Sequence, residues 1–298
     1  MDKKLRKQQP QLLTNQGDKA ENISAGWQGS LDLVYSEQDG KTQLNHCKMR
    51  SPLKVQRPFY PEGPGVCHSI ILHTAGGVVG GDLSNQNIYL SDNAHALITT
   101  AAAAKIYRSN GQEAKQIIQL HIEPDACLEW LPQETIIFNG AQYRQELRVE
   151  LAVGATWLGW EITRFGRSAR GEKFEQGEWR SHTEVWQQGK PLWLDRQWLP
   201  AREEILNSPH GLAGQPLVGT LVWLREPVSA EIIEQARSFW NAEPRRGEAG
   251  VTTLNSGLLC RYRGASTSEV RGWFTQVWQL LRFYYLGLNA KKLRVWQP

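Results

Sequence analysis

Residues 146–151 read ELRVEL, a strict alternation of charged and apolar side chains. Successive side chains of a β-strand point to opposite faces, so this period of two predicts a strand with one buried and one solvated face. Strand-like segments recur every 8–12 residues from Trp27 to about Asp195, with turn residues such as Asn139-Gly140 between them. The predicted strands are 29–34, 69–73, 86–91, 95–100, 116–122, 127–131, 135–138, 142–151, 156–164, 171–179, 183–187 and 191–197.

Helical segments do not separate these predicted strands. A parallel α/β sheet needs helical crossovers, so the pattern excludes that class and predicts an all-β body of stacked sheets. Apolar residues at helical spacing appear only late and predict helices at about 229–241 and 268–286. Ser229 is the expected N-cap of the first, and residues 266–269 fit a capping box before the second. A short third helix is predicted at 202–207.

The first 25 residues are polar, rich in glutamine and aperiodic, which predicts a disordered tail. The rest of the 298-residue chain, 26–298, is then a single β domain with late helices. Its thirteen tryptophans are expected to fill a broad β core and a partner surface rather than to form a sugar-binding platform.

The charge and cysteine content narrow the class of protein. A net charge of +4 with dispersed basic residues does not indicate a nucleic-acid partner. No apolar run approaches the roughly 18 residues of a membrane-spanning helix, and no signal-peptide core follows the basic start. The four cysteines are far apart and form no C-x-x-C pair, which favours a reducing compartment. We therefore expect a cytoplasmic protein with neither a membrane nor a nucleic-acid partner.

Residues 73–82 read HTAGGVVGGD, with two glycine pairs around a Val-Val pair. Glycine costs about 0.5–1 kcal/mol in regular structure, so four in six residues indicate positive φ angles or close backbone approach. The spacing is not G-x-G-x-x-G, and Asp82 stands where a P-loop has lysine, so a phosphate cradle is excluded. We interpret the segment as a tightly bent β crossing with Val78 and Val79 anchored in the core. Its structural glycines are Gly76, Gly77, Gly80 and Gly81.

Catalytic and closed metal motifs are weak in this sequence. The seven histidines form no H-x-x-x-H pattern, so spacing offers no closed zinc site. No G-x-S-x-G segment is present, although a nucleophile triad assembled only in the fold stays open. Glu129 and Glu134 are conceivable as an acid/base pair, but residues 130–133 between them read as a strand end and a turn.

Two basic segments have two interpretations each. Residues 99–108 read TTAAAAKIYR and form either a packed strand-to-loop joint, followed by a hairpin at Asn110-Gly111, or a basic lip beside the glycine segment. Residues 164–172 read RFGRSARGE and form either a solvated loop or a binding surface in which arginine forks anchor a partner.

Taken together, these segments resemble the UreD family of urease accessory proteins, named UreH in some organisms. The resemblance rests on an ordered set of motifs over most of residues 27–298. Residues 73–82 resemble the family's H-P-P-G-G-I-V-G-G-D, with Thr74-Ala75 in place of the usual Pro-Pro. The other matches are residues 95–108 with A-L-L-T-T…K-x-Y-R, residues 128–136 with L-E-W-L-P-Q-E-T-I, residues 166–172 with G-R-x-x-x-G-E, and residues 294–296 with a basic-aromatic C-terminus.

The resemblance implies an all-β protein of stacked, superhelically twisted sheets with a small helical portion and no catalytic turnover. It implies a scaffold between apo-urease and the accessory proteins UreF and UreG, the latter a GTPase. It also implies that nickel passes toward the urease active site through an internal polar path. No tightly bound cofactor is expected, because carboxylate, water and occasional histidine ligands suit transient contact with Ni²⁺.

We therefore predict a urease maturation factor and assign its residues accordingly. The carboxylates of the nickel path are predicted to be Asp82, Glu134 and Glu172. For Asp82, the alternative is a turn-capping carboxylate that accepts backbone N–H groups. Residues expected to position loops or bind partners are Lys105, Tyr107, Arg108, Arg167, Arg294 and Trp296.

Two other interpretations stay open at this point. The helical stripe at 270–285 and the basic arm at 291–294 could dock UreF, or the stripe could cap the β body. A carbohydrate hydrolase is the enzymatic alternative, and it would need two carboxylates about 5–9.5 Å apart in an open groove with exposed aromatic rings.

Overall fold

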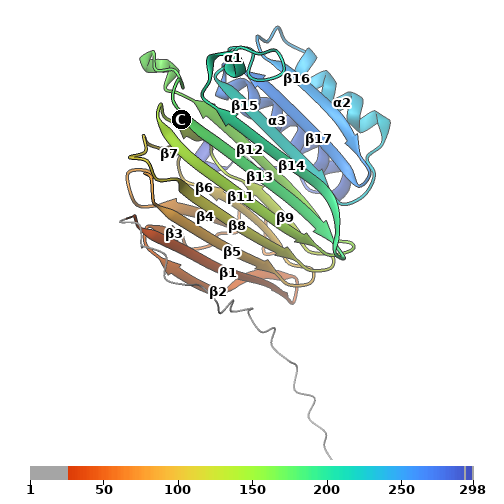
Figure 1. The fold of residues 1–298 in the computed structure, drawn as a ribbon. Helices are drawn as coiled ribbons and strands as arrows, with labels where there is room; N and C mark the ends of the chain where they lie inside the picture. The colour runs from red at the N-terminus through yellow and green to blue at the C-terminus, as the bar shows by residue number, and fades with distance from the viewer. Residues whose placement is uncertain (1–25, 292, 297–298) are drawn as a thin grey trace, which may run out of the picture.

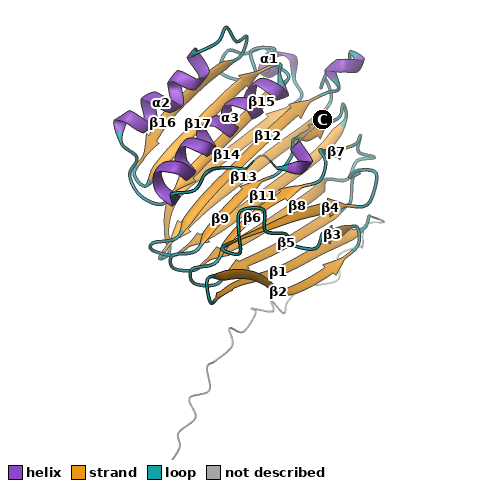
Figure 2. Cartoon of the chain, turned by 180° about the vertical axis from the view of Figure 1, so that it is seen from behind, coloured by secondary structure: helices purple, strands orange, loops and turns teal. Residues whose placement is uncertain are grey.

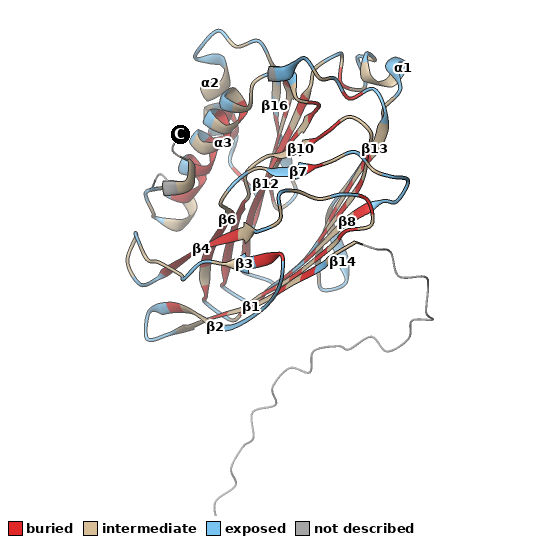
Figure 3. Cartoon of the chain, turned by 90° about the vertical axis from the view of Figure 1, so that its left-hand side faces the viewer, coloured by how far each residue is buried: buried red, intermediate tan, exposed pale blue. Residues whose placement is uncertain are grey.

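The computed structural model describes residues 26–291 and 293–296, so the tail predicted at 1–25 lies outside the described residues. Two β-sheets face each other, and helices cover the far side of one of them (Figure 1). Figure 3 shows the resulting layers, with a central sheet between the helices and an outer sheet.

The outer sheet has the strand order β14-β13-β11-β8-β5-β1-β2. In that order its strands are Lys190–Pro200, Gly177–Gln187, Ala141–Leu151, Ala114–Ile122, Leu83–Leu90, Gln28–Gln38 and Lys41–Arg50. The central sheet has the order β16-β17-β15-β12-β9-β6-β4-β3. Its strands are Glu248–Leu254, Gly257–Gly264, Leu217–Leu224, Thr156–Phe165, Cys127–Leu131, His95–Thr100, Val66–His73 and Leu53–Val55. Short β10 (Thr135–Ile137) pairs with β12 and with β7 (Ala104–Ile106).

The predicted all-β class is confirmed, but most of the pairing is parallel. Strands β1, β5, β8, β11 and β13 run parallel in the outer sheet, as do β4, β6, β9 and β12 in the central sheet. From β4 to β13 the chain alternates between the two sheets, apart from short β7 and β10. Parallel neighbours need a long crossover, and a strand of the opposite sheet provides it here in place of a helix. The fold is a solenoid of stacked sheets.

Several predicted boundaries are correct and others are not. The strands expected at 95–100 and 127–131 coincide with β6 and β9. The strand expected at 171–179 is wrong in its first part, because Gly171 ends a 3₁₀ turn (Ser168–Arg170) with φ 72° and β13 begins only at Gly177. The hairpin expected at Asn110-Gly111 is also wrong, since β7 and β8 pair with strands of different sheets.

The helices form the third layer, and Figure 2 shows α2 and α3 lying across the central sheet. Helix α2 (Ala230–Asn241) is capped by Ser229, whose hydroxyl accepts the Ile232 N–H at 3.4 Å. Helix α3 (Thr267–Leu281) is capped by Ser266 and continues into a π-helical turn, Arg282–Leu286. Short α1 (Glu203–Leu206) follows β14, and a 3₁₀ turn (Arg294–Trp296) lies near the end.

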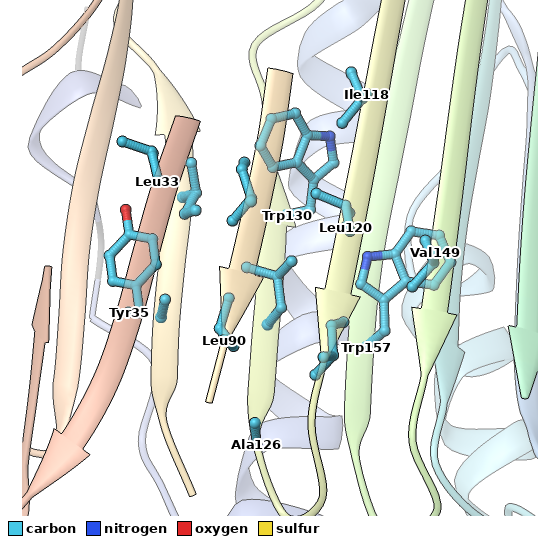
Figure 4. Close-up of a cluster of buried hydrophobic side chains, with 14 of the residues drawn as sticks. Leu33, Tyr35, Leu90, Ile118, Leu120, Ala126, Trp130, Val149 and Trp157 are labelled. Atoms are coloured by element: carbon cyan, nitrogen blue, oxygen red, sulfur yellow. The ribbon is translucent and has the colours of Figure 1, made fainter. Parts of the chain in front are cut away.

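Two large apolar clusters hold the layers together. Leu33, Leu120, Trp130, Val149 and Trp157 belong to the cluster between the two sheets, part of which Figure 4 shows. The second cluster lies between the central sheet and the helices and contains the fully buried Trp223, Trp273 and Trp278. Seven of the thirteen tryptophans are buried, as expected of a β core, and Trp198 is exposed; the partner surface stays a prediction. Among the described residues, none of the helices has the length and apolar character needed to span a membrane.

Candidate functional site

A cavity of about 620 Å³ lies between the two sheets. The inward positions of the outer sheet change character along the strands: Ser84 and Gln86 in β5 are followed by Ile88 and Leu90. In the neighbouring strands polar inward residues likewise precede apolar ones, so one band of the cavity wall is polar. One register row across the sheet contains Ser84, Gln116, Gln145 and Ser181.

Glu161 of β12 faces this polar row from the central sheet. Its carboxylate accepts hydrogen bonds at 3.1 Å from the Ser181 hydroxyl and at 3.1 Å from the Thr163 hydroxyl. Burial raises the pKa of Glu161 to about 7, and the nearby Asp195 carboxylate contributes to the rise. The side chain therefore exchanges between acid and carboxylate near neutral pH.

Asp195 of β14 also lines the cavity, but its charge is already balanced. Arg261 of β17 lies 2.8 Å from Asp195 Oδ1 and donates to the Thr220 hydroxyl at 2.7 Å. The Gln197 amide donates to Asp195 Oδ2 at 2.7 Å. Sequence reasoning missed Glu161 and Asp195. The available signal was the set of Ser, Gln, Glu and Asp residues at inward positions of otherwise apolar strand faces.

The glycine segment and the basic segment meet at the rim of the cavity. Val78 forms a parallel bridge with Ile106, through bonds of 2.8 Å from Val78 N–H to Lys105 O and from Tyr107 N–H to Val78 O. Residues 75–78 and 100–106 both line the cavity. The structure therefore favours the basic-lip interpretation of residues 99–108. Lys105 is exposed on this rim.

Three of the four predicted structural glycines have a geometric reason. A Cβ on Gly77 would collide with the Tyr107 ring and lie 2.8 Å from Lys105 O, and one on Gly80 would lie 2.5 Å from Gln112 O. Gly81 has φ 89°. The prediction is wrong for Gly76, where a Cβ would meet open space, and for Val79, which is 45% exposed rather than in the core.

Asp82 is a buried turn-capping residue, as the alternative proposed. Its Oδ1 accepts the Trp27 N–H at 3.1 Å and its Oδ2 accepts the Val79 N–H at 2.7 Å. Glu134 forms an ion pair with Arg271 of α3. None of the predicted path carboxylates is among the described residues that line the cavity. The structure does not bring Asp82, Glu134 and Glu172 together, and their contact with nickel stays a prediction.

Glu172 instead joins a cluster with three of the predicted positioning residues. Burial opposes ionisation of Glu172, but the Asn139 N–H and the Arg167 guanidinium hold its pKa below the usual value. The Arg167 guanidinium lies 4.5 Å from the Phe138 ring centroid, and the Tyr107 ring meets Phe138 edge-on. Arg108 reaches the same loop through Gln176 at 3.3 Å. The two basic segments are therefore parts of one loop cluster.

The remaining predicted residues have structural contacts or fall outside the description. Trp296 packs against Trp160 and Trp278 and donates to the Thr99 hydroxyl at 3.3 Å. The side chain of Arg294 and residue 292 lie outside the described part. Glu129 contacts Trp278 under α3 while Glu134 contacts Arg271, so the postulated acid/base pair does not form.

Glu161→Gln is expected to stabilise the protein at alkaline pH. A folded-state pKa of about 7 against an ordinary 4.5 means that the folded protein binds the extra proton, so stability falls as pH rises between these values. The cost is fully present well above pH 7 and is on the order of 3 kcal/mol. Urea unfolding at several pH values measures it. A stability difference between variant and wild type that does not grow from about pH 5 to pH 8 would contradict the prediction.

Comparisons with known proteins show which family the chain resembles. The sequence model of a family described as UreD urease accessory protein matches residues 28–297. The chain is 66% identical over 277 residues to the urease accessory protein UreD of Nostoc sp., covering 93% of this chain and 98% of that protein. It is 67% identical over 272 residues to that of Trichormus variabilis, covering 91% and 96%. With that of Synechocystis sp. it shares 43% over 261 residues, covering 87% and 97%.

Proposed function

Since the chain belongs to the UreD family of urease accessory proteins and so has a role in urease maturation, we propose that it delivers nickel through the cavity between its sheets. The observation that carries this proposal is the polar row of the outer sheet opposite Glu161. The row supplies hydroxyl and amide oxygens, and Glu161 supplies a carboxylate, inside an otherwise apolar sandwich.

The ligand atoms of this lining favour passage of nickel ions over their storage. Neutral hydroxyl and amide oxygens are weak ligands for Ni²⁺, and Glu161, the lining carboxylate not paired with an arginine, adds attraction without forming a closed site. Glu161 exchanges a proton near neutral pH, because burial raises its pKa to about 7. Protonation then lowers its attraction for the cation. We take the protein to act as a non-catalytic conduit and scaffold, as the name of an accessory protein suggests.

We also propose that the chain bridges apo-urease to UreF and UreG. The apolar residues of α3 are buried against the central sheet, with Val270, Phe274 and Val277 fully covered, so this part of the 270–285 stripe caps the β body. Phe283 and Tyr284 in the following π-helical turn are 60% and 55% exposed. Adjacent exposed aromatic side chains are typical of protein interfaces, and we assign this pair to UreF contact.

Glu161→Gln is expected to lower the nickel content of co-expressed urease several-fold. The amide keeps the size and hydrogen bonds of the side chain but removes its negative charge. The experiment co-expresses this chain with UreF, UreG and urease, then measures nickel in the purified urease. Glu146→Gln is the matched control, because Glu146 lies on the outer face of β11, paired with Arg144 at 2.6 Å.

The same preparations test the two parts of the proposal separately. Unchanged nickel content with Glu161→Gln overturns the conduit at this residue. Co-purification of the chain with UreF, UreG and urease is expected for wild type and both variants. A chain that co-purifies with none of them overturns the bridging role, whatever the nickel content.

A further inference from the structure

Three side chains with metal-ligating atoms meet on the helix-covered face of the central sheet: His95, Cys127 and Glu129. The parallel register places His95 of β6 beside Cys127 of β9. Glu129 follows Cys127 by two residues and therefore points to the same face. One ligand atom from each residue lies within 4.8 Å of the other two. The cavity is on the opposite side of this sheet.

Glu129 is held so that one oxygen faces the histidine. Its Oε1 lies 2.7 Å from His95 Nε2, while its Oε2 accepts the Trp278 indole N–H and lies 3.2 Å from Arg282 Nε. Partners that fix the remaining atoms of a ligand tune its affinity for a metal. Glu129 is fully buried, but the His95 side chain is 15% exposed, so an ion can reach the cluster from solvent at His95.

The charges around the cluster allow a cation. Arg282 would repel one, but Glu62 lies 2.8 Å from its Nη1 and offsets its charge. His68 contacts the other Glu62 oxygen at 2.6 Å. A divalent ion bound here would be balanced by the Cys127 thiolate and the Glu129 carboxylate.

We propose that His95, Cys127 and Glu129 bind one divalent transition-metal ion of the Zn²⁺ or Ni²⁺ type. Imidazole, thiolate and carboxylate are the ligands of protein zinc sites, and three of them leave a fourth position for water. Ni²⁺ binds the same donor types. The site goes beyond the proposed function, because it lies apart from the cavity and retains its ion rather than passing it.

The test loads the full chain with Zn²⁺ or Ni²⁺ alone and measures retained metal after dialysis. A Cys47→Ser background removes the exposed thiol. One ion per chain is expected, and Cys127→Ser and His95→Gln are expected to weaken binding at least tenfold. Cys260→Ser is the matched control, since Cys260 is an equally buried thiol in β17, outside the cluster. Loading with Co²⁺ should give a thiolate-to-cobalt charge-transfer band that Cys127→Ser abolishes.

A wild-type chain that retains neither metal overturns the proposal, as does a folded Cys127→Ser chain that retains it. If Cys127→Ser does not fold, alkylation of the unsubstituted chain decides. Bound Zn²⁺ is expected to slow alkylation of Cys127 and to leave that of Cys260 unchanged. Equal rates with and without the ion overturn the proposal.

Discussion

Replacing Arg282 with methionine is expected to lower the free energy of unfolding by about 3–5 kcal/mol at neutral pH. Arg282 is fully buried between Glu62, 2.8 Å from Nη1, and Glu129, 3.2 Å from Nε. Methionine occupies a similar volume but supplies no charge. Two buried carboxylates then lack their shared cation, and an uncompensated buried charge is among the costliest defects in a folded protein.

Lowering the pH is expected to reduce the loss of unfolding free energy that Arg282→Met causes. Burial opposes ionisation of Glu62, but His68 and Arg282 lower its pKa to about 2. A carboxylate with a lowered folded-state pKa contributes stability above its unfolded pKa and loses it as pH falls toward the folded value. Without Arg282, Glu62 protonates at a higher pH and the penalty is relieved. The difference between wild type and variant is therefore expected to shrink below pH 4.5, the ordinary value.

Urea unfolding followed by far-UV circular dichroism measures this loss, with Arg196→Met as the control. Arg196 forms an ion pair with Glu184 at 3.1 Å, but its side chain is 65% exposed. Exposed pairs of this kind contribute under about 1 kcal/mol. An Arg282→Met loss no larger than that of the control would show that the buried network does not tie the helical layer to the sheet.

Local signals predicted the class of the fold better than its strand pairing. Alternation such as that at 146–151 identified half-buried strands because one face meets the core and the other meets water. It could not identify parallel pairing, since the neighbours of a strand are set by chain crossings far apart in sequence. Strand β15 reads LVGTLVWL and was missed because both of its faces are buried, so it has no alternation.

The difference between local and long-range contacts also separates the site residues that were found from those that were missed. The turn-capping role of Asp82 was foreseen as an alternative because one of its donors, the Val79 N–H, lies three positions away in the sequence. Glu129 was considered, and argued against, as half of an acid/base pair, but its partner Trp278 was not found because it lies 149 positions away. For Glu161 the local signal was only a polar residue on an otherwise apolar strand face. Its importance comes from Ser181 across the cavity, on another sheet.

The second large effect is expected at Trp273, whose replacement by alanine should cost about 3–5 kcal/mol. The side chain is fully buried between α2 and α3, and its indole N–H donates to Ala236 O at 3.0 Å. Its ring also lies against Trp240, with centroids 5.5 Å apart. Alanine removes these contacts and leaves a cavity between the two helices.

Trp198→Ala is the matched control, because Trp198 sits on β14 with 58% of its surface exposed and Arg180 5.4 Å from its ring centroid. Such an exposed contact contributes about 0.5–1 kcal/mol. Both variants are unfolded in urea and followed by far-UV circular dichroism, which registers helix and sheet together. If each variant unfolds in a single transition, and this transition moves to lower urea concentration in Trp273→Ala but not in Trp198→Ala, the helices unfold together with the β body. If the helix signal is lost first and the strand transition does not shift, the helices unfold independently of the β body.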